Sequence, residues 1–240
     1  MNRRDAAVAM AAACKSPAAM IAAVTGTASV AAAQFEPGKG LTGLPRQDFT
    51  PPPAGSYRLP VIQPSPSGLV LEGDRWPRRL SAYTTGAITL LGFVYTYCSD
   101  PVGCPLAFAA MVDVRERIAR LPQLRNRARL VSLSFDPTHD TPAAMQAYGG
   151  EHARTLAPRW HFITTASMSR LAPILAGLGQ DAEVERNADG TPTRVITHVL
   201  KVFLLDPHGR VREIYSAAFL MPEVIVNDML TLALETDAAS

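Results

Sequence analysis

The chain has 240 residues, of which 48% are hydrophobic and 18% are charged, and its formal net charge is +2. This composition is typical of one globular domain with short extensions and supplies enough apolar residues for a sizeable core. Outside residues 1–33 the acidic and basic residues balance, and no block of Lys or Arg occurs. The sequence therefore shows no basic stretch of the kind that binds nucleic acid or an anionic membrane surface.

The first 33 residues have the features of an export signal. Two arginines at positions 3 and 4 are followed by an alanine-rich stretch that ends in Ala31-Ala32-Ala33. Small residues at the last and third-last positions suit signal peptidase, so we predict a signal peptide over 1–33 with cleavage near Ala33 and a periplasmic mature protein. Lys15 and Pro17 interrupt the apolar run, which argues against a membrane-spanning helix. The alternative is an uncleaved alanine-rich tail.

Residues 34–68 contain eight prolines. Such a segment can be neither a central strand nor a long helix, because proline lacks a backbone N–H donor. We predict an extended arm, packed along the domain, or a linker.

Strands and helices alternate from residue 69 onward. The apolar run at 87–95 predicts a central strand buried on both faces, and Thr141 followed by Pro142 predicts a helix start with Thr141 as the N-cap. Asn187 to Gly190 predicts the tip of a hairpin. The order of elements indicates an α/β domain over 69–236, with a mixed sheet flanked by helices. The other predicted strands are 69–73, 129–135, 162–164, 198–205 and, antiparallel to it, 210–216, and the other predicted helices are 106–121, 167–178 and 222–234.

Two cysteines lie in the turn after the central strand. Cys14 leaves with the signal peptide, so the mature chain retains Cys98 and Cys104. An exported protein with one close cysteine pair either forms a disulfide or binds a metal. Cys104 precedes Pro105, which we expect as the first helical residue, so Cys104 would be the N-cap. The helix dipole there would lower its thiol pKa and favour the thiolate.

A histidine could complete a metal site with this cysteine pair. Two thiolates can hold Cu(I), and an added imidazole can hold Cu(I) or Cu(II). We expect His198 to begin the strand 198–205, and His139 follows the strand 129–135 near the same edge of the sheet. A histidine at this position would not by itself indicate a metal site. His198 becomes a candidate ligand because the cysteine pair could bind the same ion.

Four stretches in the same order resemble the SCO/SenC family of copper proteins. The similarity extends over roughly 69–234. The stretches are GFVYTYCSDPVGCP at 92–105, VSLSFDPTHDTP at 131–142, WHFIT at 160–164 and THVLKVFLLDPHG at 197–209.

The resemblance implies a thioredoxin-like fold and one copper ion bound by Cys98, Cys104 and His198. It also implies a partner, an apo copper enzyme such as the cytochrome c oxidase subunit with a CuA site, to which the family delivers copper or whose thiols it adjusts. Asp136 matches an acidic residue near the family's site, where it would orient a ligand or contact a partner. The family usually has three residues between its cysteines, whereas this chain has five. His139 is absent from the usual motif and could add a ligand.

The main alternative function is an enzyme, a thiol–disulfide oxidoreductase in which Cys98 and Cys104 cycle between dithiol and disulfide. A typical oxidoreductase has two residues between its cysteines, so the five-residue spacing weighs against efficient exchange. A thiol peroxidase is a third reading, although the chain lacks a Thr-x-x-Cys peroxidatic motif.

Overall fold

A computed structural model describes residues 48–73, 76–98, 100 and 103–238. The signal peptide predicted over 1–33 lies outside the described residues, as does the first part of the Pro-rich arm. The strands are β1 Gln63–Pro64, β2 Leu69–Val70, β3 Arg78–Arg79, β4 Ile88–Val94, β5 Ala128–Ser134, β6 Arg159–Ile163, β7 Ala182–Arg186, β8 Pro192–His198, β9 Lys201–Leu205 and β10 Arg210–Ser216. The helices are α1 Ser81–Thr84, α2 Cys104–Ala119, α3 Pro122–Arg125, α4 Pro142–Arg154, α5 Met168–Leu178, the 3-10 turn η1 Ala217–Phe219 and α6 Pro222–Ala238.

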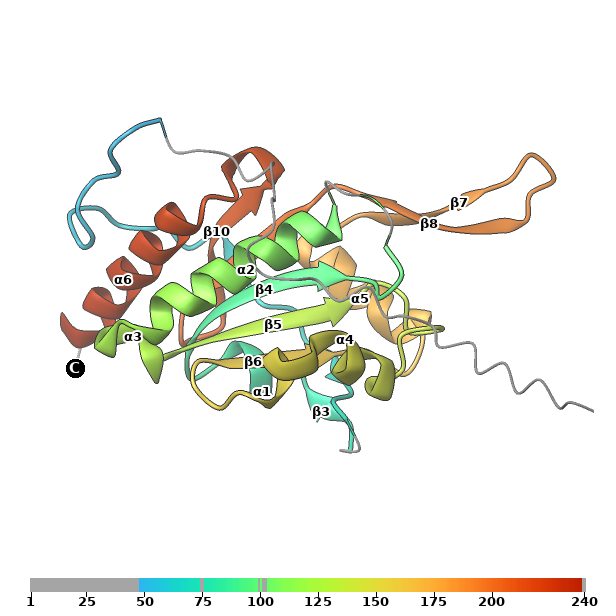
Figure 1. Ribbon diagram of the computed structural model, residues 1–240, viewed down its shortest axis with the longest axis horizontal. Helices are drawn as coiled ribbons and strands as arrows, with labels where there is room; N and C mark the ends of the chain where they lie inside the picture. Colours follow the sequence, from blue (N-terminus) through green and yellow to red (C-terminus); the bar gives the residue numbers. More distant parts are fainter. Residues whose placement is uncertain (1–47, 74–75, 99, 101–102, 239–240) are drawn as a thin grey trace, which may run out of the picture. The chain divides into compact units, whose positions relative to one another are not determined.

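Six strands form a mixed sheet in the order β1-β10-β9-β4-β5-β6. β4, β5 and β6 are parallel, whereas β9 and β10 are antiparallel to their neighbours. α2 connects β4 to β5, α4 connects β5 to β6, and α6 packs against α2. Figure 1 shows these helices in front of the sheet and α5 behind it. Because both faces are covered, every residue of β4 is buried, as the continuous apolar run predicts.

Local sequence signals account for several element boundaries. The Thr141 hydroxyl accepts a hydrogen bond from the Ala144 amide at 3.2 Å, which confirms the predicted N-cap of α4. α5 ends at Gly179, whose positive φ of 61° is the left-handed conformation that glycine adopts without strain. Within the described residues, no helix has the length and apolar character needed to cross a membrane.

The described part of the Pro-rich arm is fastened to the domain. β1 pairs with the outer edge of β10, a position that tolerates proline. Further back, the Tyr57 hydroxyl donates to Asp228 of α6 at 2.5 Å, and the Tyr215 hydroxyl donates to the other oxygen of the same carboxylate at 2.7 Å. The arm is therefore part of the fold over these residues.

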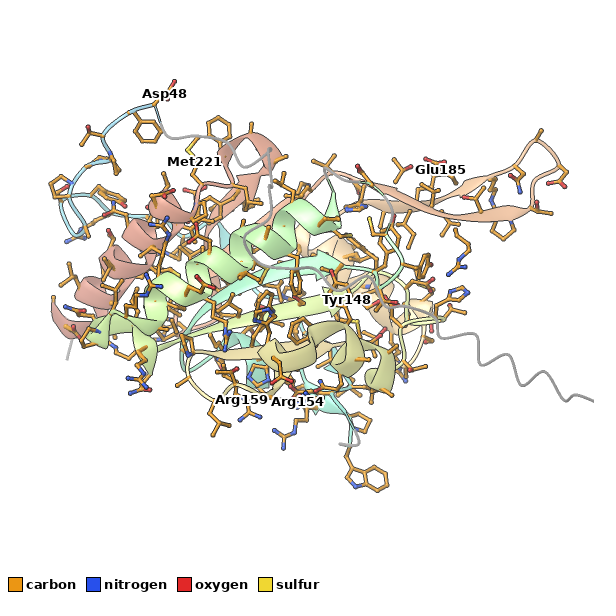
Figure 2. All side chains as sticks on the ribbon, viewed as in Figure 1. Asp48, Tyr148, Arg154, Arg159, Glu185 and Met221 are labelled. Atoms are coloured by element: carbon orange, nitrogen blue, oxygen red, sulfur yellow. The ribbon has the colours of Figure 1, made fainter. Side chains whose placement is uncertain are left out.

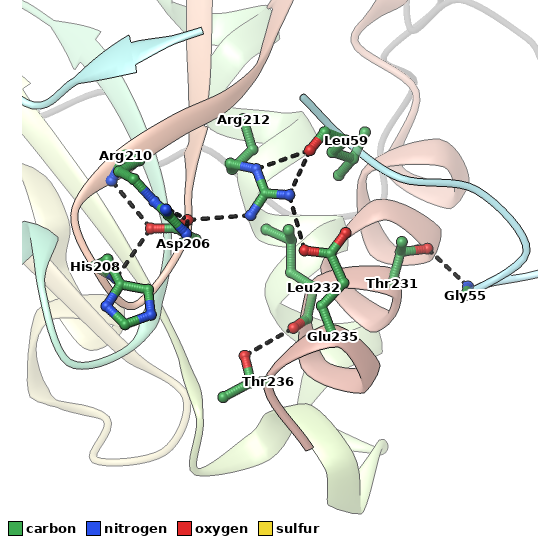
Figure 3. Close-up of polar contacts among 10 residues, drawn as sticks. All are labelled: Gly55, Leu59, Asp206, His208, Arg210, Arg212, Thr231, Leu232, Glu235 and Thr236. Carbon is green, nitrogen blue, oxygen red and sulfur yellow. Dashed lines mark hydrogen bonds and ion pairs between the residues drawn. The ribbon is translucent and has the colours of Figure 1, made fainter. Parts of the chain in front are cut away.

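A buried arginine in β10 also holds the arm. The Arg212 guanidinium donates to the Leu59 carbonyl and pairs with Asp206 at 3.1 Å and Glu235 at 2.8 Å (Figure 3). Arg210 contacts the same Asp206 carboxylate at 2.7 Å. Because this network joins the arm, the β9–β10 turn and α6, it fixes three segments that are far apart in the sequence.

β7 and β8 form a separate two-stranded ribbon rather than part of the main sheet. Figure 1 shows this hairpin extending away from the helices, and Figure 2 marks its position with Glu185. The hairpin tip predicted at 187–190 is confirmed. The strand predicted over 198–205 is wrong at residues 198–200, because His198 is the last residue of β8 and β9 begins at Lys201. The chain leaves the ribbon between these two residues in order to enter the sheet.

Candidate metal centre

Cys98 and Cys104 lie beyond the carboxyl end of β4, the edge of an α/β sheet where ligands bind. Cys98 is half-buried, Cys104 is buried at 2% exposure, and both thiols are free. The helix N-cap is Gly103, so the prediction that Cys104 would be the N-cap is wrong and Cys104 is the first helical residue. A Cβ at Gly103 would lie 2.9 Å from an Asp100 carboxylate oxygen, a contact that rotation of the exposed Asp100 side chain would relieve.

The two thiols share one hydrogen bond and differ in acidity. The Cys104 thiol donates to the Cys98 sulfur, which is the largest cause of a lowered Cys98 pKa of about 5; burial opposes this shift, and the Tyr95 hydroxyl adds a second donor. The same hydrogen bond, together with burial, raises the pKa of Cys104. The expected thiolate at Cys104 is therefore wrong, because the hydrogen bond to Cys98 and, after it, burial raise the Cys104 pKa. The lowered pKa favours the thiolate at the more exposed sulfur, Cys98.

His198 presents one ring nitrogen for a ligand. Its Nδ1 lies 2.9 Å from the Ile196 carbonyl, and since a carbonyl can only accept, Nδ1 carries the proton. Nε2 therefore keeps its lone pair, which is the arrangement found in metal-bound histidines. The ring packs on Phe135, with 4.4 Å between centroids. His198 and Cys104 line the same small apolar hollow, together with Phe93, Ala107, Phe135, Leu200 and Lys201.

The described residues do not gather three His, Cys, Asp or Glu side chains closely enough to hold a metal ion together. Cys104 and His198 line the same hollow. Joint binding of one ion by Cys98, Cys104 and His198 would therefore require the three side chains to come closer together. Two soft thiols and one neutral imidazole suit copper, so the chemistry of the donors fits the implied metal.

Asp136 organises the loop beside Cys98 rather than the sulfurs themselves. Its carboxylate accepts hydrogen bonds from the Tyr97 hydroxyl, from the Thr138 amide at 3.0 Å and from His139 Nδ1 at 2.6 Å. Burial opposes ionisation, but these donors prevail and lower the Asp136 pKa. Since Tyr97 precedes Cys98, Asp136 acts on the cysteine loop through Tyr97.

Comparison with known proteins identifies the family to which this fold belongs. The family model described as SCO1/SenC matches residues 78–233. The chain belongs to the SCO1/SenC family. A search of curated proteins gives no match.

Solved structures of related proteins share the fold of this SCO1/SenC chain. Apo Sco1 from Thermus thermophilus is 25% identical with a TM-score of 0.57, and the match covers 74% of this chain and 95% of that one. ScoI from Bradyrhizobium japonicum with copper bound is 21% identical with a TM-score of 0.53, covering 68% and 95%. A SCO1/SenC family lipoprotein from Bacillus anthracis is 22% identical with a TM-score of 0.56, covering 71% and 95%. The predicted thioredoxin-like fold, with a mixed sheet flanked by helices, is confirmed.

Sequence reasoning missed four side chains around the site of this SCO1/SenC protein. Tyr95 donates to Cys98, and Tyr97 links Cys98 to Asp136. Asp140 accepts from Thr96 Oγ1 at 2.6 Å, which pins the other side of the cysteine loop. The two tyrosines flank Cys98 at close spacing, a signal that sequence reasoning could have used. Arg194, which lies over Tyr97, has no such signal because it is distant in the sequence.

Proposed function

We propose that this SCO1/SenC protein is an exported copper metallochaperone that binds one copper ion through Cys98, Cys104 and His198. The observation that carries the proposal is the donor set, in which Cys98, with its lowered pKa, accepts a hydrogen bond from Cys104, and an imidazole whose Nε2 is available lines the same hollow as Cys104. Soft sulfur ligands favour copper among the first-row metals. Three related proteins were solved with copper bound, from Bradyrhizobium japonicum, Arabidopsis thaliana and yeast.

The chain's own residues would prepare the ion's binding and release. The Cys98 sulfur is already ionised near neutral pH, so only the Cys104 proton has to leave when both sulfurs bind. Ile196 holds the His198 ring in one tautomer, and the surrounding Phe93, Phe135 and Leu200 exclude water from one side of the hollow. Cys98, the more exposed sulfur, is the ligand that an incoming partner thiol could replace first.

The proposed recipient is an apo copper enzyme such as a cytochrome c oxidase subunit with a CuA site. A related protein, BsSco, is described as a member of the Sco family of cytochrome c oxidase assembly proteins. The signal-like features of residues 1–33 support the proposed export, and we propose contact with a membrane only through the partner. N-terminal sequencing of protein recovered from the periplasm should begin at or near Gln34, whereas an intact N-terminus would contradict cleavage.

Titration of the reduced chain with Cu(I) against a competing chelator tests copper binding directly. We expect one equivalent to bind. Cys98→Ala and Cys104→Ala should each lose most of the affinity, and His198→Ala should change the Cu(II) absorption spectrum. His208→Ala is the matched control because His208 is an exposed histidine in the β9–β10 turn. Absence of binding by the intact chain would refute the proposal.

One observation favours a second function, thiol–disulfide exchange. An accessible thiolate paired with a buried thiol is the arrangement in which the first sulfur attacks a partner disulfide and the second resolves the mixed disulfide. The Cys98–Cys104 pair has this asymmetry. An insulin-reduction assay separates the two functions: rapid turnover that survives His198→Ala would support the oxidoreductase, and negligible turnover would support the metallochaperone.

A further inference from the structure

The position of His198 depends on a ribbon that has few supports of its own. β7 and β8 pair only with each other among the described residues. An isolated two-stranded ribbon is marginally stable in water, so contacts with the rest of the molecule must fix where its last residue lies. Gln180 supplies one of them from behind, through its Nε2 bond to the Val199 carbonyl at 2.9 Å.

The face of β8 that carries His198 lies over the cysteine loop. Ile196 and His198 are alternate residues of β8 and point to the same side of the strand. Ile196 is buried, and the His198 ring packs on Phe135. Arg194 lies where the register of β7 and β8 shifts, between the pairs Val184–Ile196 and Arg186–Pro192, and its guanidinium lies 4.5 Å from the centroid of the Tyr97 ring. β8 thus contacts the rest of the domain at Arg194 as well as at Ile196 and His198.

Tyr97 links three parts of the site: the cysteine loop, Asp136 and β8. It directly precedes Cys98 in the chain, its hydroxyl donates to Asp136 beyond β5, and its ring lies under Arg194 of β8. Its ring edge also contacts Tyr95 at 5.0 Å between centroids. A displacement of Tyr97 would therefore shift both the Cys98 loop and β8, the strand that ends in His198.

The charges strengthen this contact. The ion pairs formed by the described residues do not include Arg194, so its cation faces the aromatic ring without a competing carboxylate. Donation of the Tyr97 proton toward the Asp136 carboxylate increases the electron density of the ring, which favours a cation above its face.

We propose that Arg194 and Tyr97 form a latch that fixes β8, and with it His198, relative to the loop that carries Cys98. Both are positioning residues, because neither supplies a donor atom to the ion. Through the latch, β8 and the cysteine loop keep a fixed relative position before a ligand arrives. The proposal rests on the proposed copper function for its consequence, but the latch itself exists in the metal-free protein.

The metal-free chain provides the first test. The ring of Phe135 at 4.4 Å shifts the NMR signals of the His198 imidazole away from their exposed positions. In Arg194→Gln we expect those signals to move toward the exposed positions, and in Arg194→Lys, which keeps the cation, we expect them to stay close to the original. Arg186→Gln is the control, since Arg186 lies on the same hairpin but bonds only within its tip, to the Gly190 carbonyl.

Copper affinity provides the second test. A cation–π contact at an exposed site corresponds to about a two- to fivefold change in affinity, which is the loss expected in Arg194→Gln and Tyr97→Leu. Arg194→Lys should recover most of it, and Arg186→Gln should bind as the original chain does. The thermal midpoint of each variant verifies that it is folded.

His198 signals that coincide in Arg194→Gln and the original chain would overturn the latch, whatever the copper result. Failure of the intact chain to bind copper would instead refute the proposed function, and the NMR comparison would still decide the latch. The two failures are therefore distinguishable.

Discussion

Replacing Cys104 with alanine should change how the reactivity of Cys98 depends on pH. The Cys104 thiol is the largest cause of the lowered Cys98 pKa of about 5, while Tyr95 and backbone amides supply smaller contributions. A full return to the ordinary cysteine pKa of about 8.5 sets the upper limit of the effect. Near pH 6 the thiolate fraction would then fall from about nine-tenths to about one in three hundred.

The intrinsic reactivity of the thiolate changes in the opposite sense. A thiolate of higher pKa is the better nucleophile, and a shift of about 3.5 pKa units with a Brønsted coefficient of 0.4–0.5 makes it about 40-fold more reactive. The original chain should therefore react about sevenfold faster than Cys104→Ala near pH 6, and roughly 20-fold slower near pH 8.5. The order of the two rates should invert at about pH 7.

The assay is the rate at which reduced, metal-free protein reacts with an aromatic disulfide that releases a coloured thiol. Cys14→Ser in every variant removes the remaining cysteine. Cys98→Ala is the control and should react slowly throughout, because Cys104 is buried, and burial restricts access and still raises its pKa after the hydrogen bond to Cys98 is lost. If Cys98→Ala reacted near pH 6 as fast as the original chain, the thiolate would be at Cys104 and the assignment from the structure would fail.

Three further predictions concern stability, measured by thermal and urea unfolding. Tyr57→Phe removes a 2.5 Å hydrogen bond to Asp228 and should cost about 1.5 kcal/mol, or roughly 3–6 °C in Tm; an unchanged Tm would mean that the arm is not held there. Arg212→Leu leaves a buried carboxylate without one of its partners and should cost about 3–5 kcal/mol; a cost below that of Tyr57→Phe would contradict the network. Gly149→Ala places a Cβ 2.5 Å from the Phe162 ring and should cost about 1–3 kcal/mol; a neutral result would show that α4 can shift.

The strand and helix pattern of the domain was largely predictable because it depends on local properties. The apolar run that became β4 and the Thr141 cap of α4 carry their information within a few residues. The errors lie where tertiary contacts decide. His198 ends β8 rather than beginning a long strand, because the ribbon and the main sheet are separate and the chain must pass between them.

The candidate ligands Cys98, Cys104 and His198 were identified from motifs, and their joint binding of copper stays a prediction. The structure brings the two cysteines together, since their thiols share a hydrogen bond although five residues separate them, whereas the three candidate ligands do not meet in one group among the described residues. The sequence predicted a lowered thiol pKa at Cys104, whereas in the structure the pKa is lowered at Cys98 and raised at Cys104. Helix position was visible in the sequence, whereas the burial of Cys104 was not.

The sequence by itself determined the order of the elements, the family resemblance and the residue types of the candidate site, because periodicity, caps and motifs are local. Only the tertiary structure decided which sulfur is ionised, which histidine nitrogen is available and how Arg194 reaches Tyr97. These properties depend on burial and on contacts between distant segments, and neither quantity is encoded by spacing along the chain.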